Sequence, residues 1–336
     1  MERPGFVSVF ALLIMSVILI NSLFVLSIVT LQNHIALSST TKIQSNILAK
    51  DKINRLFYEK DNFDKYLKPK IIKNCRRTSY PKEIDLDDDH ELKKYINKTE
   101  IIMEERNNRK NMFINISTNY KGMSNYSSSY GPIINIIFEI NRGYISEREI
   151  DDVIEYREEF YKLMDIIEKE IYDYDCNPTS SVKRINTNGN IKISNDFIRK
   201  KRNRTGEDNS YYEILSDYKH KHILLNIKDD EDEKAILELG EVEDEKTILL
   251  RGTLYIEGDL IINQNFEFEG IMILNNGNII VNSSNSPIIR GMILHKGYNE
   301  LDMEMLKIIP NQKYIYEYGS YLPGFIDPEI KVIKNY

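Results

Sequence analysis

Apolar residues form one long run at the amino-terminal end of the chain. Residues 6–29 are predominantly apolar, and no residue from position 6 to position 33 carries a charge. A helix needs about 20 such residues to cross the hydrocarbon core of a bilayer. A cleaved secretory signal has a shorter apolar stretch followed by an Ala-x-Ala site, and no such site follows here. The pattern predicts a membrane-spanning helix over residues 6–29.

The same helix is predicted to continue beyond the membrane. Neither proline nor glycine occurs between Gly5 and Pro69, and these two residue types are the strongest helix breakers. Several apolar positions fall within one arc of about 120° on a helical wheel, the width of a face packed on a core. They are Ile35, Ala36, Ile43, Ile47, Ile53 and Phe57. We expect residues 30–68 to form an amphipathic extension that lies against a globular domain.

The middle of the chain, residues 71–247, is polar and predicts a mixed α/β region. Residues 132–140 have the β-rich composition of a strand. Ser146 and Glu149 have the spacing of a capping box, so a helix is expected to start there. An apolar stripe to about Tyr174 indicates a core-facing helix rather than a coiled-coil seam. The stripe consists of Val153, Phe160, Met164, Ile167 and Ile171.

Short β-rich runs separated by glycines repeat within residues 248–336. Gly252, Gly270 and Gly291 occupy equivalent places in three runs, at intervals of 18 and 21 residues. This period is that of one turn of a β-solenoid, in which parallel strands stack and inward aliphatic residues form a continuous core. We predict a short right-handed β-solenoid-like repeat; a meandering antiparallel sheet is the alternative. The inward ladders are expected from Leu254 and Ile256, Ile271 and Ile273, and Ile288 and Ile293.

A segment rich in tyrosine, proline and glycine, residues 314–328, follows the repeat. Open ends of a parallel stack expose unpaired backbone groups and need a cap. We expect this segment to form a lid over one end of the repeat. The predicted fold class is α+β, with a long N-terminal helix, a mixed middle region and a C-terminal repeat.

Charge argues against nucleic acid as a partner. The 336 residues include 45 Lys and Arg against 52 Asp and Glu, a formal net charge of −7. A dedicated nucleic-acid binder carries a positive field that attracts phosphate. The acidic balance therefore favours other partners.

The sequence contains no common catalytic motif. The phosphate loop, Gly-x-Ser-x-Gly, His-Glu-x-x-His, Cys-x-x-Cys and the dinucleotide fingerprint are all missing. Acidic residues of the repeat are the candidates for carboxylate catalysis on a polysaccharide. They are Glu257, Asp259, Glu267 and Glu269. Two or three turns provide little of a sugar-length groove, so we expect no enzyme and no cofactor.

Two patterns suggest metal binding and fail on their details. Residues 85–91 place acids at the first, third and fifth positions of an EF-hand loop, but His90 and Ile96 stand where glycine and glutamate are needed. His220 and His222 would share one face of a strand without a third ligand. We expect no metal site.

Two further features have open interpretations. Cys75 and Cys176 are the only cysteines, and they either form one disulfide outside the cytoplasm or stay as two thiols. The basic run at residues 199–204 either contacts an anionic polymer or lipid headgroups, or forms an exposed loop.

The junction at Gly5 and Phe6 carries a family resemblance. A polar leader of five residues ends in Gly5, Phe6 follows, and the apolar helix begins at once. This arrangement resembles the type IV pilin-like proteins, which include pilins and the pseudopilins of type II secretion. Residues 27–49, where the helix becomes polar, further resemble the PilX-like and K-type minor members.

The resemblance implies a processing site and a set of packing positions. A prepilin peptidase would cut after Gly5, remove the leader of residues 1–5 and methylate the amine of Phe6. Most pilins carry Glu at the fifth mature position, where this chain has Phe10; the K-type minor subunits also lack this Glu and are thought to sit at the filament tip. Pro4 stands where Lys or Arg is usual. Packing between helices is expected at Phe10, Ile35, Ile43 and Ile47.

We therefore expect a non-catalytic minor pilin or pseudopilin of a bacterial type IV pilus or type II secretion-like filament. Its partners would be other pilin-like subunits, the prepilin peptidase and the lipid bilayer. It would cross the cell membrane once, with most of the chain outside the cytoplasm. The alternative is an uncleaved membrane anchor that presents a β-solenoid-like binding or scaffold domain outside the cell.

Overall fold

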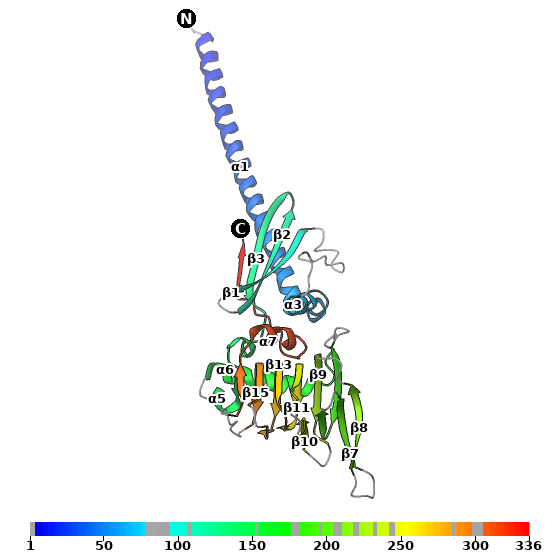
Figure 1. Ribbon diagram of the computed structural model, residues 1–336. Helices are drawn as coiled ribbons and strands as arrows, with labels where there is room; N and C mark the ends of the chain where they lie inside the picture. The colour runs from blue at the N-terminus through cyan, green and yellow to red at the C-terminus, as the bar shows by residue number, and fades with distance from the viewer. Residues whose placement is uncertain are drawn as a thin grey trace.

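The computed structural model describes residues 4–77, 83, 95–106, 109–151, 154–175, 182–194, 197–203, 210–217, 222–230, 234–241, 246–283, 286–297 and 305–335. A long helix, an antiparallel sheet and a larger body of two mainly parallel sheets follow one another along the molecule (Figure 1). The fold is α+β, as the sequence predicts.

Helix α1 (Pro4–Tyr58) contains 55 residues and projects away from the rest of the molecule (Figure 1). At 1.5 Å per residue it is about 80 Å long. The chain continues through α2 (Lys60–Asn62), a π-helical turn η1 (Phe63–Leu67) and α3 (Lys68–Cys75). Pro69 lies in the first turn of α3, where a missing N–H removes no helical hydrogen bond. The predicted continuous helix is therefore interrupted at Glu59, whose backbone is extended, and helical structure then passes residue 68, where the sequence predicts its end.

An antiparallel sheet, here called the proximal sheet, packs on the C-terminal half of α1. Its strands stand in the order β1 (Ile96–Arg106), β2 (Arg109–Tyr120), β3 (Met123–Pro132) and β17 (Val332–Asn335). Lys121 and Gly122 join β2 to β3, and both have positive φ, as a tight hairpin turn requires. The last strand of the chain thus returns to the sheet on which the first helix rests.

The distal body contains two sheets, here called the covered sheet and the outer sheet. The covered sheet has the order β16 (Lys307–Ile309), β15 (Ile288–Lys296), β13 (Phe266–Asn275), β11 (Ile248–Ile256), β9 (His222–Lys228) and β5 (Lys183–Asn188), with β4 (Tyr144–Ser146) also beside β15. The outer sheet has the order β14 (Ile279–Val281), β12 (Gly258–Ile262), β10 (Ala235–Leu239), β6 (Ile191–Ser194), β7 (Phe197–Asn203) and β8 (Ser210–Asp217).

The chain alternates between these two sheets. β5, β9, β11 and β13 lie in the covered sheet, and the strand that follows each of them, β6, β10, β12 or β14, lies in the outer sheet. Neighbours within each sheet pair in parallel, except for the antiparallel pairs β6–β7 and β7–β8 of the outer sheet. The alternation begins at β5, upstream of residue 248. The glycine repeat does not reveal the earlier strands, because in β9 the residue that pairs with Gly252 is Ile223 and not a glycine.

The predicted alignment of glycines is confirmed by the strand register. Gly252 pairs with Gly270, and Gly270 pairs with Gly291. All three have φ between 140° and 150°, a region that disfavours other residues. A Cβ atom on Gly270 would lie 1.9 Å from the carbonyl oxygen of Gly252. Only glycine therefore fits at each level of this ladder.

The predicted inward ladders are partly wrong. Leu254 pairs with Met272, and Met272 pairs with Ile293, in the core between the two sheets. Ile271 and Ile273 belong to the opposite face of the covered sheet. Ile288 is half-buried and pairs with Glu267. In β11, β13 and β15 the residues that follow the aligned glycine are mostly apolar on both faces of the covered sheet. Alternation of apolar and polar residues therefore does not indicate which face is the inner one.

Two helices cover the second face of the covered sheet. α6 (Ile154–Glu170) follows α5 (Glu147–Asp151). The Glu149 backbone N–H donates to Ser146 Oγ at 3.2 Å, which confirms the serine half of the predicted capping box. The buried stripe of α6 is confirmed as a core-facing one; its described members are Phe160, Met164, Ile167 and Ile171. α7 (Gln312–Gly319) lies across β11, β13 and β15.

Two predictions on local structure are wrong. The strand expected over residues 132–140 ends with β3 at Pro132, and η2 (Ile136–Glu139) is a short 3-10 helix. Asn135 caps it by accepting a hydrogen bond from the Ile137 N–H at 3.0 Å. Residues 314–328 do not close one end of the stack, because Thr253 in the middle of β11 donates to the Tyr318 carbonyl. A buried apolar run has similar composition in a strand and in a packed turn, so composition alone did not separate them.

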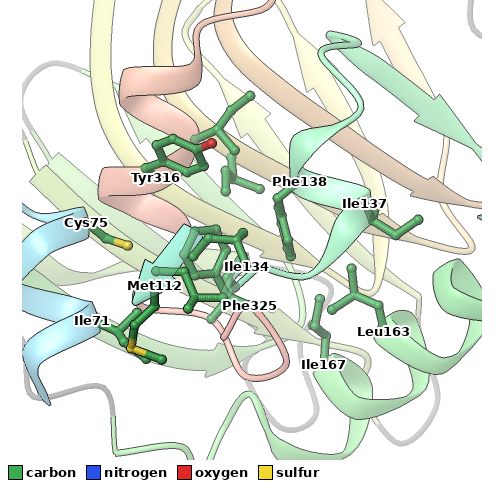
Figure 2. Close-up of a cluster of buried hydrophobic side chains, with 14 of the residues drawn as sticks. Ile71, Cys75, Met112, Ile134, Ile137, Phe138, Leu163, Ile167, Tyr316 and Phe325 are labelled. Carbon is green, nitrogen blue, oxygen red and sulfur yellow. The ribbon is translucent and has the colours of Figure 1, made fainter. Parts of the chain in front are cut away.

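One continuous core joins the proximal sheet to the distal body. It includes α3, the strand ends near η2, helix α6 and the C-terminal segment (Figure 2). Phe138 and Phe325 lie at its centre with ring centroids 4.9 Å apart. Met112 of β2 and Leu163 of α6 bury their side chains in the same cluster. The two parts therefore share packed side chains rather than a linker.

Candidate functional site

The first half of α1 is the largest exposed apolar feature of the described chain. Every side chain from position 6 to position 40 is exposed. An 18-residue window of this helix has a mean hydropathy of 2.7, and none of it is buried. Exposed apolar surface of this extent is not stable in water. The helix is long and apolar enough to span a membrane.

Hydroxyl groups on this helix make internal hydrogen bonds. Ser16 Oγ donates to the Leu12 carbonyl at 2.8 Å, and Thr30 Oγ1 donates to the Leu26 carbonyl at 2.8 Å. In a bilayer core each polar hydrogen without a partner is costly, and bonding to the carbonyl four residues earlier removes that cost. These residues are therefore compatible with lipid contact.

The junction suggested by the sequence lies in the first turn of α1. The helix begins at Pro4, so Gly5 and Phe6 belong to it. The rings of Phe6 and Phe10 stack with centroids 6.4 Å apart, and both side chains are exposed. Phe6 and Phe10 thus present an aromatic surface in the first turns of α1.

The seat of α1 on the proximal sheet is partly polar. Ser45 and Thr118 are fully buried, and their hydroxyl oxygens lie 2.5 Å apart. β3 presents small polar side chains toward the helix, and their small size allows a close approach. They are Asn125, Ser127 and Ser129. Ile53 and Leu56 add apolar contact nearer the end of the helix.

The predicted apolar stripe of α1 is only partly confirmed as a face toward the chain's own domain: Ile53 and Phe57 pack on the core. Ile53 is buried, but Ile35 is exposed, and Ile43 and Ile47 keep 55% and 52% of their surface in solvent. The buried face instead contains Ser45 and Ala49. Because α1 packs on small polar side chains of the proximal sheet, the hydrophobicity of its residues does not indicate which of its faces makes this contact. Ile43 and Ile47 are left on the outward side, and their role in packing against other subunits stays a prediction.

A buried ion pair lies where the proximal sheet meets the distal body. Glu139 of η2 accepts from Arg109 Nε at 2.6 Å, from the Lys110 backbone N–H at 2.7 Å and from the Tyr316 hydroxyl at 3.3 Å. Burial raises the pKa of Glu139, and the hydrogen bond from Arg109 acts against that rise. Lys110 Nζ also donates to Asn74 of α3. The network connects β2, η2, α3 and α7. Sequence reasoning missed it because its members are far apart along the chain.

The four candidate carboxylates are each held by a different partner. Arg251 Nε lies 2.5 Å from Glu269, and Arg290 Nη1 lies 2.8 Å from Glu267. Glu257 accepts from the Tyr255 hydroxyl at 3.0 Å, and burial raises the pKa of Glu257. Burial acts to raise the pKa of Asp259, but hydrogen bonds from Lys234 and Asn278 lower it. Each of the four carboxylates therefore contacts at least one neighbouring side chain of the distal body.

Two histidines are bound to tyrosines. His222 Nδ1 lies 2.7 Å from the Tyr318 hydroxyl, and burial lowers the pKa of His222. His295 Nε2 lies 2.8 Å from the Gly277 carbonyl, and Nδ1 lies 2.9 Å from the Tyr144 hydroxyl. A carbonyl only accepts, so Nε2 of His295 carries the hydrogen and Nδ1 accepts from tyrosine. Burial thus favours the neutral form of both rings, and each ring is hydrogen-bonded within the distal body.

The remaining predicted sites lie largely outside the described residues. His220, Cys176 and residues 85–91 are among the residues that the structure does not describe. Within the described ranges, no group of three His, Cys, Asp or Glu side chains is placed to hold a metal ion. Cys75 is buried with a free thiol, and burial raises its pKa to about 12.

The basic run is a strand, not a loop, over its described part. Arg199, Lys200, Lys201 and Arg202 belong to β7 and alternate between its two faces. Lys200 is buried and donates to Asn188. Arg202 Nε donates to Glu213 at 2.9 Å. The run is therefore divided into two pairs with different surroundings.

No protein-family model, curated protein or solved structure matches this chain.

Proposed function

We propose that this protein is a non-catalytic minor subunit of a type IV pilus or type II secretion-like filament. One observation carries the proposal. A single unbroken helix exposes every side chain from position 6 to position 40 and fixes its C-terminal turns on an antiparallel sheet. Such a helix can serve first as a membrane anchor and then as a packing element, because its folded domain does not depend on the exposed half.

The assembly step in this proposal is an exchange of contacts. After removal of residues 1–5, the helix from Phe6 leaves lipid and packs against helices of other subunits. Lipid tails are as apolar as the helix surface, so close packing and not the hydrophobic effect must favour the exchange. Ile43 and Ile47, on the side away from the proximal sheet, extend this contact surface beyond the bilayer.

Phe10 supports a position at the filament tip. A subunit that inserts under others brings its fifth mature residue next to a neighbour's amine, and Glu at that place neutralises the amine. Phe10 offers no carboxylate, and its ring stacks on Phe6 instead. An unpaired charge in hydrocarbon is costly, so a tip subunit without an amine above it gains from an apolar residue here.

The distal body would be the part presented at the surface. Its alternating parallel strands and glycine ladder support a β-solenoid. A permanently anchored envelope protein that presents this body is the second candidate. Pro4, where a basic residue is usual before the cleavage site, favours that candidate.

Processing at Gly5 separates the two candidates. Co-expression with an active prepilin peptidase should convert the wild-type chain to a shorter form, and Gly5→Leu should block this conversion. Ser8→Leu lies beyond the junction and should be processed normally. Persistence of the full-length wild-type chain beside an active peptidase would support the permanent anchor and contradict the filament subunit.

A further inference from the structure

Cations and aromatic residues share one face of the β6–β7–β8 part of the outer sheet. Lys192 pairs with Arg199, and Lys201 pairs with Tyr212, so all four point to the same side of the sheet. The opposite side of the same strands carries Ile191, Ile193 and Ile198, which are buried in the core. Lys192, Arg199, Lys201 and Tyr212 together are called the hairpin face.

The positive charge of this face is only partly neutralised. Lys192 Nζ lies 3.8 Å from a Glu241 oxygen, and Glu238 of β10 pairs with Lys192 on the same face. No described carboxylate lies within ion-pair distance of Arg199 or Lys201. Lys201 is exposed and Arg199 is half-buried. Arg199 and Lys201 are thus two cations without an acidic partner among the described residues, on a chain that is acidic as a whole. Such a surface is suited to an anionic ligand.

Aromatic rings stand beside these cations. Tyr212 keeps 43% of its surface exposed, and Lys192 Nζ lies 6.0 Å from its ring centre. Arg199 lies 5.6 Å from the ring centre of Phe197. The exposed ring of Tyr212 provides a stacking surface next to these charges. The combination fits a ligand with flat apolar faces and negative groups, rather than a bare anion.

The position of the hairpin excludes the anchoring membrane as the source of the anion. β7 and β8 lie at the end of the molecule opposite to the amino terminus of α1 (Figure 1). The helix alone is about 80 Å long. Headgroups of the bilayer that holds α1 are therefore out of reach, and the ligand must come from beyond that membrane.

We propose that the hairpin face binds an anionic polysaccharide. Sugar rings have flat C–H faces that stack on Tyr212, while their carboxylate or phosphate groups pair with Arg199 and Lys201. The surface runs along open strands, so it suits an extended chain rather than an enclosed small molecule. The net charge of −7 disfavours the more highly charged nucleic-acid backbone. This site does not depend on processing at Gly5.

Binding of the full-length protein in detergent micelles to immobilised polygalacturonate tests the proposal, with dextran as the neutral polymer. Wild type should bind polygalacturonate and not dextran. The Arg199→Gln/Lys201→Gln variant should lose at least about tenfold in affinity and show a shallower salt dependence. Tyr212→Ala should lose about fivefold or more, and Tyr212→Phe should retain binding because the ring is kept.

Arg202→Gln is the matched control, because it removes a positive charge from the same strand on the other face. It should bind within about twofold of wild type. Unchanged melting temperatures would show that the variants are folded. The proposal is overturned if wild type does not bind, if Arg202→Gln weakens binding as much as the double variant, or if oligothymidylate binds as tightly as polygalacturonate.

Discussion

The Ser45 hydroxyl of α1 lies 2.5 Å from the Thr118 hydroxyl of β2, and both side chains are fully buried. Thr118 Oγ1 also lies 3.4 Å from the Ser45 carbonyl oxygen. A polar contact at Ser45 thus holds α1 on the proximal sheet. It lies just after residues 6–40, the part of the helix in which every side chain is exposed. Ile53 and Leu56 lie two and three turns further along and provide the apolar part of the seat.

Thr118→Val should weaken this seat. The substitution keeps the shape and leaves the buried Ser45 hydroxyl without its side-chain partner, which costs about 1–3 kcal/mol. Denaturant unfolding of the purified protein measures the free energy. The double variant Ser45→Ala/Thr118→Val should lose less than the sum of the single variants, since neither hydroxyl remains. Additive losses would show that the two hydroxyls do not interact.

Gly270→Ala should prevent the distal body from packing. The new Cβ would lie 1.9 Å from the Gly252 carbonyl oxygen, at a φ of 150°. Backbone strain and displacement of a paired strand together should cost more than about 3 kcal/mol. Gly122→Ala is the control, because it also has positive φ but meets no atom within 4 Å. Thermal unfolding should separate the two variants clearly; equal melting temperatures would contradict a close-packed ladder.

His295 should make stability depend on pH. Burial lowers the pKa of His295 below the ordinary value, so acid protonates the unfolded chain before the folded one. The contribution of His295 is therefore complete above its unfolded pKa of about 6.5 and is lost as the pH falls below it. His295→Gln should show a smaller loss of stability than wild type between about pH 7.5 and pH 5.5. His34→Gln, at an exposed position of α1, should behave as wild type.

An identical pH profile for His295→Gln and wild type would contradict the neutral, buried state of this ring. The groups that face it are the Tyr144 hydroxyl and the Gly277 carbonyl, with the Glu147 charge acting in the opposite direction.

Ile43→Lys/Ile47→Lys should impair assembly without loss of the fold. Both side chains are exposed, so the free energy of unfolding should change by less than about 0.5 kcal/mol. The amount recovered in sheared filaments should fall strongly, because two charges would enter a packed helix surface. Gln44→Lys adds a charge at a neighbouring exposed position on another side of the helix and should have little effect. Normal incorporation of the double variant would remove these positions from the proposed interface.

Local signals in the sequence were sufficient for several elements. The missing glycines and prolines between Gly5 and Pro69 predicted the long helix α1, but not its end at Tyr58, where the backbone of Glu59 is extended. Ser146 predicted the start of α5 through its own hydrogen bond. The spacing of Gly252 and Gly270 predicted the register between β11 and β13. At these two positions a Cβ atom would collide with the backbone of the neighbouring strand.

Other features depend on how helices and sheets that are distant in the sequence pack on one another. Local sequence patterns do not predict this packing. Ile271 and Ile273 face the helices because α6 and α7 cover that side of the sheet, and the same residues facing inward would give the same pattern. Ser45 marks the seat of α1 by its small size and not by hydrophobicity. Glu139 and Arg109 pair only after β2 and η2 are brought together.

The intact mass of the protein purified from its own cells tests the central claim most directly. A processed filament subunit should lack residues 1–5, begin at Phe6 and carry one additional methyl group. A mass that corresponds to the chain with residues 1–5 still attached, in cells that process known prepilins, would contradict the account.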